Sequence, residues 1–142
     1  MNKLSYKIFL FLLVITVSLQ SQDLLIFGGK NHDQFLGCMI CKKFDPESIW
    51  NINGQYGSPN RSGSIWNKLG EYGSPYSSYS PWNELATDPP VLVDRDGNFY
   101  GYFTANRAYP KRTNIELALY LTDNYEEYID KIDEFIEQMN DK

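Results

Sequence analysis

The sequence is poor in the side chains that most often carry catalysis and metal binding. It contains one histidine, His32, and two cysteines, Cys38 and Cys41. It has no G-x-S-x-G elbow and no glycine-rich phosphate-binding loop, and its single histidine stands in a turn-rich segment. Carboxylate pairs such as Glu126 and Glu127 fall on a polar helix face. The sequence therefore favours a non-catalytic protein that needs no cofactor.

Long apolar runs are also lacking, apart from one at residues 8–19, IFLFLLVITVSL. This run is short for a membrane span, which takes about 20 apolar residues. Lys3 and Lys7 precede it and small or polar residues follow it, as in a secretory signal peptide. We predict that residues 1–21 are removed after Ser21, with an uncleaved membrane anchor as the alternative. The remaining protein is then secreted or periplasmic, without a stable membrane span.

Basic residues are outnumbered. The chain has 13 Lys and Arg against 18 Asp and Glu, a net charge of −5, and removal of Lys3 and Lys7 makes the remainder two charges more negative. Such a surface repels phosphate backbones, so nucleic acid is not an expected partner. Residues 22–142 suit a single domain. Aromatic residues, at 15% of the chain, are expected to supply much of its core.

Two β-hairpins are predicted, one on each side of the middle of the chain. Their apolar runs lie at 24–27 and 35–40, within residues 22–43, and at 90–93 and 99–105, within residues 90–106. Asp96-Gly97 between the last two runs is a strong hairpin-turn signal. Because an isolated hairpin is only marginally stable, we expect the two hairpins to form one small antiparallel sheet.

The hairpins resemble each other in sequence. The tripeptide at residues 35–37, Phe-Leu-Gly, matches Phe-Tyr-Gly at residues 99–101, and each follows a polar turn. Glycine within a strand marks a place where another group approaches the backbone closely. We therefore expect close packing against Gly37 and Gly101.

The segment between the hairpins, residues 44–89, repeats itself every sixteen residues. Ser-x-Trp-Asn begins at Ser48, Ser64 and Ser80, and the first two copies agree at ten of sixteen positions. Gly54 and Gly70 stand where a short helix would stop. We predict one or two helical turns per copy, followed by a Tyr-Gly-Ser-Pro turn. An array of β-hairpins is the competing interpretation.

The repeated phrase has two interpretations. As architecture, its aromatic rings would pack the copies together while its asparagine amides satisfy backbone groups in turns. As a binding surface, rows of aromatic rings, amides and hydroxyls would hold a cell-envelope glycan or a protein. The candidate residues are Trp50, Trp66, Trp82, Asn51, Asn67, Asn83, Tyr56 and Tyr72. Buried tryptophans would favour a scaffold, and exposed ones a ligand.

Two helices are predicted in residues 113–140. A short one covers 115–121, and Asp123 with Glu126 has the spacing of a capping box for the next. Apolar residues then recur on one face at Tyr125, Tyr128, Ile129, Ile132, Phe135, Ile136 and Met139. This amphipathic helix is expected to cover the sheet, with docking on a separate partner as the alternative.

Cys38 and Cys41 are expected to form a disulfide outside the cytoplasm. A bridge at this spacing requires a tight turn at Met39 and Ile40, because an extended Cys-x-x-Cys places the α-carbons about 10 Å apart. Two alternatives are a metal site completed by His32 and Asp33, and buried free thiols. Thioredoxin-like chemistry is disfavoured because Cys38 continues a strand.

A calcium loop is the other metal site considered, at residues 94–98, Asp-Arg-Asp-Gly-Asn. The register fails, since the first ligand position would be Leu92 and the closing glutamate position is Phe103. A hairpin turn accounts for the same residues.

The segments together resemble a family of small secreted bacterial proteins. The likeness rests on FLGCMIC, the S-I-W-N-x-x-G-x-Y-G-S phrases and DPPVLVDRDGNFYGYFTAN, and it covers most of residues 22–142. The resemblance implies variable numbers of the phrase between a Cys-x-x-Cys segment and a second hairpin, and it implies no activity.

These observations predict an α+β domain with a small antiparallel sheet, turn-rich repeats and a C-terminal amphipathic helix. The function that fits best is a non-catalytic binding module for an envelope glycan or protein. The alternative is a small thiol or metal-binding protein that uses Cys38, Cys41 and His32.

Overall fold

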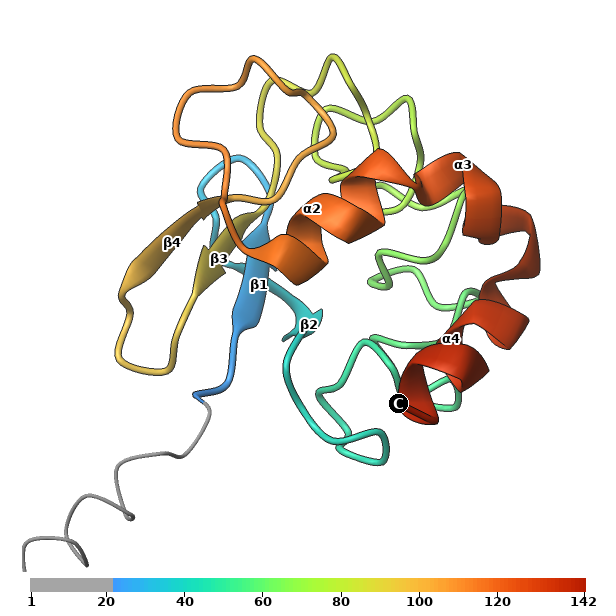
Figure 1. Cartoon of the computed structure of the whole chain (residues 1–142). Coiled ribbons are helices and arrows are strands. Elements are labelled where there is room, and N and C mark those ends of the chain that lie inside the picture. The colour runs from blue at the N-terminus through green and yellow to red at the C-terminus, as the bar shows by residue number, and fades with distance from the viewer. Residues whose placement is uncertain (1–21) are drawn as a thin grey trace, which may run out of the picture.

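The computed structural model describes residues 22–142, so the predicted signal peptide lies outside the described residues. Figure 1 shows a small sheet on one side, helices in an arc on the other, and a long coiled segment beside them. Within residues 22–142 no helix is both long and apolar enough to cross a membrane. The α+β prediction is confirmed.

The sheet has four strands, all antiparallel to their neighbours, in the order β2-β1-β3-β4. Their bounds are β1 Leu25–Gly28, β2 Gln34–Cys38, β3 Val91–Val93 and β4 Phe99–Tyr102. The pair β1 and β3, in which Leu25 lies opposite Val93 and Phe27 opposite Val91, joins the two hairpins. The prediction that the hairpins are two halves of one sheet is confirmed.

Gly37 and Gly101 lie at equivalent, tightly packed points of β2 and β4. Both have a positive φ, 118° and 100°, which glycine adopts without steric penalty. A β-carbon would lie 2.7 Å from Ile49 Cγ2 at the first and 2.6 Å from Thr113 Cα at the second. Each glycine is followed by an isolated parallel bridge, Cys38 with Ser48 and Tyr102 with Arg112. The close approach expected at both glycines is confirmed.

The turn between β3 and β4 is held by the buried carboxylate of Asp94. It accepts hydrogen bonds from the backbone N–H groups of Asp96 (3.0 Å) and Asn98 (2.9 Å), from the Asn98 amide (2.8 Å) and from the Tyr100 hydroxyl (3.0 Å). These bonds, the Asn98 amide foremost, lower the pKa of Asp94. Gly97, with φ 82°, completes the turn.

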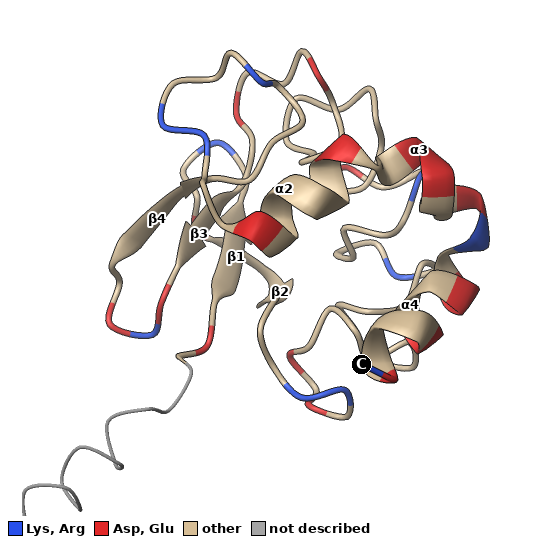
Figure 2. Ribbon diagram, viewed as in Figure 1, with Lys and Arg blue, Asp and Glu red and all other residues tan. Residues whose placement is uncertain are grey.

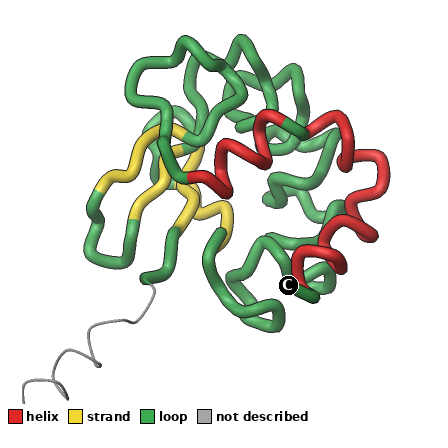
Figure 3. Tube along the Cα trace, viewed as in Figure 1, coloured by secondary structure: helices red, strands yellow, loops and turns green. Residues whose placement is uncertain are grey.

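The repeat section contains no helix or hairpin, so the helical turns predicted for each copy are wrong (Figure 3). It is instead a succession of hydrogen-bonded turns. Within one copy, the N–H groups of Ser48, Asn51, Gly54 and Arg61 donate to carbonyls three residues earlier, and that of Ser58 donates four residues back. Five such turns span sixteen residues, which accounts for the period.

Short polar side chains prevent the turns from merging into a helix. Ser, Asp or Asn stands at the start of most turns, and its side-chain oxygen accepts the N–H two residues later. This bond recurs from Asp45, Ser48, Asn51, Ser58, Ser64, Asn67, Ser74, Ser77, Ser80 and Asn83. The backbone is therefore fixed in turns without a helical ladder.

The C-terminal part is helical but interrupted. Its elements are α2 Glu116–Asp123, α3 Tyr125–Tyr128, the 3-10 turn η1 Ile129–Lys131 and α4 Ile132–Asn140. The predicted capping box is wrong, because Asp123 is the last residue of α2 and α3 begins without a side-chain cap. The predicted apolar face is buried except at Met139, which is partly exposed.

The predicted amphipathic helix, here α3, η1 and α4, packs on the tryptophans of the repeats, which corrects the expected docking on the sheet. Tyr125 stacks on Trp82 with ring centroids 4.7 Å apart, Tyr128 meets Trp66 edge-on at 6.1 Å, and Phe135 lies 6.3 Å from Trp50. The helical aromatics thus meet the tryptophans in reverse order, so the helices run antiparallel to the succession of copies. Rings of similar size on both sides give this interface its fit.

Candidate functional site

The three tryptophans form one hydrogen-bonded stack. Each indole N–H donates to a carbonyl of the preceding layer: Trp50 to Met39 (2.7 Å), Trp66 to Ile49 (2.7 Å) and Trp82 to Ile65 (2.6 Å). The ring centroids of successive tryptophans are 5.7 and 5.5 Å apart. Each copy therefore lies on the previous one as an equivalent layer.

The sheet hairpins close both ends of this stack. Met39, which receives the first indole, directly follows β2. At the other end the carbonyl of Pro81 accepts the backbone N–H of Ala105 at 2.7 Å, and Phe103 packs edge-on against Trp82 at 5.5 Å. Two and a half layers, too few for a freestanding solenoid, are thus shielded by the sheet.

The serines and asparagines of the phrase hydrogen-bond to the backbone within the repeat section. Ser48, Ser64 and Ser80 are fully buried, and each hydroxyl accepts the N–H of the following tryptophan. Each asparagine amide donates to a carbonyl six residues earlier, at 3.3, 3.1 and 3.0 Å for Asn51, Asn67 and Asn83. These bonds are those that the architectural interpretation predicts.

The indole rings are too deeply buried to form a ligand-binding surface. Trp50, Trp66 and Trp82 are only 6, 1 and 3% exposed, so no sugar ring can stack on them. Tyr56 and Tyr72 are half-buried against the first hairpin, Tyr56 meeting Phe35 edge-on at 4.9 Å and Tyr72 lying beside Gly28. The sequence-predicted binding residues are brought together, but as a scaffold.

The repeat section instead exposes large apolar side chains that sequence reasoning missed. Leu69 is 96% and Leu85 83% exposed at the same position of consecutive copies; Phe44 is 82% and Tyr76 91% exposed at another shared position. We call these four residues the exposed repeat edge. The sequence feature that could have identified these exposed positions is their variation between copies. Buried positions keep the same residue, whereas Asn53 stands at the position of Leu69 and Leu85, and Asn60 at that of Phe44 and Tyr76.

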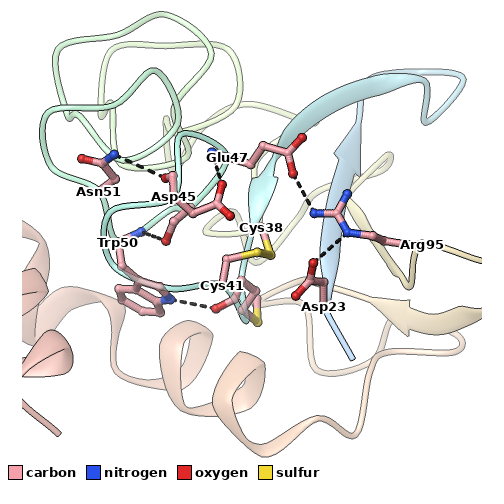
Figure 4. Close-up of a disulfide and its surroundings, with 10 residues drawn as sticks. Asp23, Cys38, Cys41, Asp45, Glu47, Trp50, Asn51 and Arg95 are labelled. Atoms are coloured by element: carbon pink, nitrogen blue, oxygen red, sulfur yellow. Dashed lines mark hydrogen bonds and ion pairs between the residues drawn. A yellow bond between two sulfur atoms is a disulfide. The ribbon is translucent and has the colours of Figure 1, made fainter. Parts of the chain in front are cut away.

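The predicted disulfide is present. Cys38 and Cys41 are bonded with their α-carbons 5.7 Å apart, which requires the tight turn expected at Met39 and Ile40. Figure 4 shows the bridge beside Trp50, whose indole N–H points to the carbonyl of Met39 inside the disulfide loop. The bridge therefore fixes the carbonyl on which the stack begins.

The metal site considered from the sequence is not assembled. His32 Nε2 hydrogen-bonds the carbonyl of Pro89 at 3.0 Å, away from the cysteines. Asp23 instead lies beside them, its carboxylate and the two sulfurs within 4.8 Å of one another. Arg95 binds Asp23 at 2.7 Å and Glu47 at 2.8 Å, as Figure 4 shows. Sulfurs joined in a disulfide offer no thiolates, so the oxidised group is not a metal site.

Removing the disulfide should weaken the fold only moderately. A loop this small gives a loop-closure contribution of about 2 kcal/mol. We expect Cys38→Ala/Cys41→Ala to lower the free energy of unfolding by about that amount in urea titrations followed by near-UV circular dichroism. The double variant should be insensitive to dithiothreitol, and the wild type in dithiothreitol should match it. Complete unfolding on reduction would contradict this account.

Comparison of the chain with protein-family models, with curated proteins and with solved structures finds no match. The resemblance to secreted bacterial proteins with S-I-W-N-x-x-G-x-Y-G-S phrases stays a prediction.

Proposed function

We propose that this chain is a non-catalytic interaction module, secreted or periplasmic, whose stacked repeats form a scaffold and whose exposed repeat edge contacts a partner protein. The edge is the observation that supports it. Its four large apolar side chains are 82–96% exposed, although this domain buries nearly all its other large aliphatic residues. Tyr76 and Leu85 line the same surface hollow, and exposed apolar side chains that lie together are typical of interaction sites.

The arrangement of the edge favours a protein over a glycan. Leu69 and Leu85 stand in consecutive layers of a stack whose tryptophan rings are about 5.5 Å apart, so they form a short row. Leucine provides neither a flat ring nor a hydrogen bond for a sugar. Leucines flanked by aromatic residues are instead suited to a protein interface, where aromatic anchors are enriched. An envelope glycan is the alternative outcome of the test.

The proposed location is supported by the disulfide. Cys38 and Cys41 are bridged, and such bridges persist mainly outside the reducing cytoplasm. The basic and apolar composition of residues 1–21 supports export.

The test compares two double variants that remove exposed apolar side chains. Leu69→Ser/Leu85→Ser alters the edge, and Phe99→Ser/Tyr120→Ser removes two half-exposed rings elsewhere. Envelope proteins of the source cell that bind to the immobilised wild type are first identified and purified. Each is then titrated by calorimetry against the wild type and against both variants. We expect the edge variant to bind at least tenfold more weakly and the control within twofold of wild type.

Two results would overturn the proposal. Equal binding by both variants would remove the edge from the interface. A glycan array on which the wild type binds a saccharide, with that binding lost in Phe44→Ser/Tyr76→Ser, would replace the protein partner by a glycan.

The thiol or metal alternative is supported by one observation, the carboxylate of Asp23 beside both sulfurs. Native mass spectrometry tests it. The alternative requires that the reduced protein, which gains two hydrogen atoms, retains added Zn²⁺, and that Asp23→Asn loses it.

A further inference from the structure

The two cysteines of the disulfide differ in how accessible they are. Cys38 is the last residue of strand β2 and is completely buried, at 0% exposed. Cys41 is half-buried and lines a hollow of about 520 Å³, whereas Cys38 is not among the residues that line it. We call this space the bridge hollow. A group that enters it reaches the sulfur of Cys41 and not that of Cys38.

The bridge hollow combines apolar and basic side chains. Its apolar lining comes from Met39, Ile40, Leu117 and Met139. Lys42 and Lys43, which directly follow Cys41, also line it, and neither takes part in an ion pair among residues 22–142. Figure 2 shows basic residues in the loop that follows β2. Unpaired cations beside a sulfur favour its thiolate form, and they attract acidic segments.

The carboxylate of Asp23 is a second, independent feature of the bridge. One of its oxygens and the two sulfurs all lie within 4.8 Å of one another. Arg95 binds this carboxylate at 2.7 Å, and Figure 4 shows Asp23 between Arg95 and the bridge. A disulfide bond carries no proton and no charge, so its stability does not require a carboxylate nearby. Thiol–disulfide exchange does use a base, because the attacking thiol must lose its proton.

The fold holds the disulfide loop in place by bonds that do not involve sulfur. The backbone N–H of Cys38 donates to the carbonyl of Glu47 at 2.7 Å, and that of Met39 donates to the carbonyl of Leu24 at 2.7 Å. The indole of Trp50 donates to the carbonyl of Met39, also at 2.7 Å. The two sulfurs therefore stay close together when the disulfide opens, so the bond can form again.

We propose that the Cys38–Cys41 bridge is a thiol–disulfide exchange site that takes electrons from a dithiol of another protein. The first substrate thiol gives its proton to Asp23, and its sulfur bonds to Cys41 while the Cys38–Cys41 bond breaks. Cys38 leaves as a thiolate and takes that proton from Asp23. The second substrate thiol then attacks the substrate sulfur of the mixed disulfide, which forms the substrate disulfide, and its proton passes to the released Cys41. Two electrons and two protons thus move from the substrate to the cysteine pair.

This activity is additional to the proposed contact at the exposed repeat edge. It differs from thioredoxin-like chemistry, in which a helix N-terminus activates the cysteine. Cys38 ends a strand, as the sequence predicts, and the assistance comes from Asp23 and the two lysines. The expected substrate is a protein dithiol flanked by apolar and acidic residues, because these complement the lining of the bridge hollow.

The test mixes the oxidised wild type with a capped pentapeptide, Glu-Leu-Cys-Leu-Glu, which has no second thiol to complete the exchange. Acid and N-ethylmaleimide stop the reaction at short times, and tandem mass spectrometry locates the adducts. We expect the peptide on Cys41 and the maleimide on Cys38 at least tenfold more often than the reverse. The same peptide with lysine in place of glutamate should react at least threefold more slowly.

Asp23→Asn should slow adduct formation at least tenfold at neutral pH, because the attacking thiol loses its base. The difference should disappear at about pH 10, where the peptide is already a thiolate, and a merely structural role would not produce this recovery. Glu47→Gln is the matched control. It removes the other ion pair of Arg95, at 2.8 Å, without removing the carboxylate beside the sulfurs, so its rate should stay within twofold of wild type.

A second pair of variants tests the role of the lysines. Lys42→Gln/Lys43→Gln should slow the acidic peptide at least threefold. Lys30→Gln/Lys131→Gln removes as much charge from exposed positions that do not line the bridge hollow, and it should stay within twofold of wild type.

Three results would overturn the exchange site: adducts divided equally between the cysteines, equal rates for Asp23→Asn and Glu47→Gln, or no adduct under conditions in which the peptide reacts with oxidised glutathione. Leu69→Ser/Leu85→Ser should exchange like the wild type. If exchange fails while that double variant still loses the partner, the proposed function stands alone. If exchange proceeds but the double variant keeps the partner, the edge is refuted instead.

Discussion

Replacing Trp66 by alanine is expected to lower the free energy of unfolding by about 5 kcal/mol. Trp66 is the middle ring of the stack and is 1% exposed, so its removal leaves a large cavity, which by itself lowers stability by about 3–5 kcal/mol. The carbonyl of Ile49 also loses its donor, which adds about 1–3 kcal/mol. Since small domains are stable by only about 5–15 kcal/mol, this variant should lose at least a third of its stability.

Urea unfolding followed by circular dichroism measures this effect. Trp66→Phe, which keeps a ring but not the N–H, should lie between alanine and wild type. Leu69→Ala, three residues away and 96% exposed, serves as the control and should change stability by less than about 0.5 kcal/mol. A loss below about 1 kcal/mol for Trp66→Ala would show that the stack does not hold the layers together.

The second large effect is expected at a glycine of the repeated phrase. A β-carbon at Gly73 would collide with the backbone carbonyl of Asn67 and lie 2.9 Å from its nitrogen. Backbone atoms within a layer cannot move aside as a flexible side chain would. Gly73→Ala should therefore lower the free energy of unfolding by about 3 kcal/mol, at the upper end for overpacking. Thermal unfolding by calorimetry gives the value.

Gly63→Ala is the matched control, because a β-carbon at Gly63 meets no atom within 4 Å. The same substitution there should change stability by less than about 0.5 kcal/mol. Gly57, equivalent to Gly73, faces the carbonyl of Asn51 in the same way, so Gly57→Ala should repeat the loss. Similar small effects at all three glycines would refute the layered packing.

The sheet could be predicted because its signals are local. Asp96-Gly97 specifies one hairpin turn, and the related tripeptides at residues 35–37 and 99–101 indicate equivalent strands. The positive φ at Gly37 and Gly101 agrees with this, since each strand is approached closely at its glycine. Pairing of the hairpins followed because neither is stable alone.

The shape of the repeat could not be predicted from spacing alone. Ser48 and Asn51 are residues that begin either a helix or a turn, because both conformations use the side-chain oxygen to accept a backbone N–H. The choice depends on the indole of Trp66, which bonds a carbonyl 17 residues earlier and fixes one layer on another. Such a long-range bond leaves no local signal in the sequence.

The C-terminal helices show the same limit. Their apolar face was readable from spacing, but the surface that it covers was not, because the Trp stack exists only after the layers form. Asp123 with Glu126 fits a capping box, yet α2 continues to Asp123 and its carboxylate binds Arg112 at 3.0 Å. Tertiary contact overrides the local capping preference here.

The candidate site was only partly predictable for a related reason. Trp50, Trp66 and Trp82 are residues that suit either a core or a ligand surface, and their burial decides for the core. The exposed positions hold different residue types in different copies, Asn53 against Leu69 and Asn60 against Tyr76, so they give no repeat signal in the sequence. In a layered protein the repeating positions build the interior. The varying positions, such as Leu69 and Tyr76, are therefore the better candidates for a binding surface.

Hydrogen exchange of the three indole N–H groups, followed by NMR in D₂O, tests the layered stack most directly. Each group is buried and bonded to a carbonyl of the layer below, at 2.6–2.7 Å. The account predicts that all three exchange together, at the slow rate set by global unfolding. Exchange of any one of them near the rate of free tryptophan would contradict it.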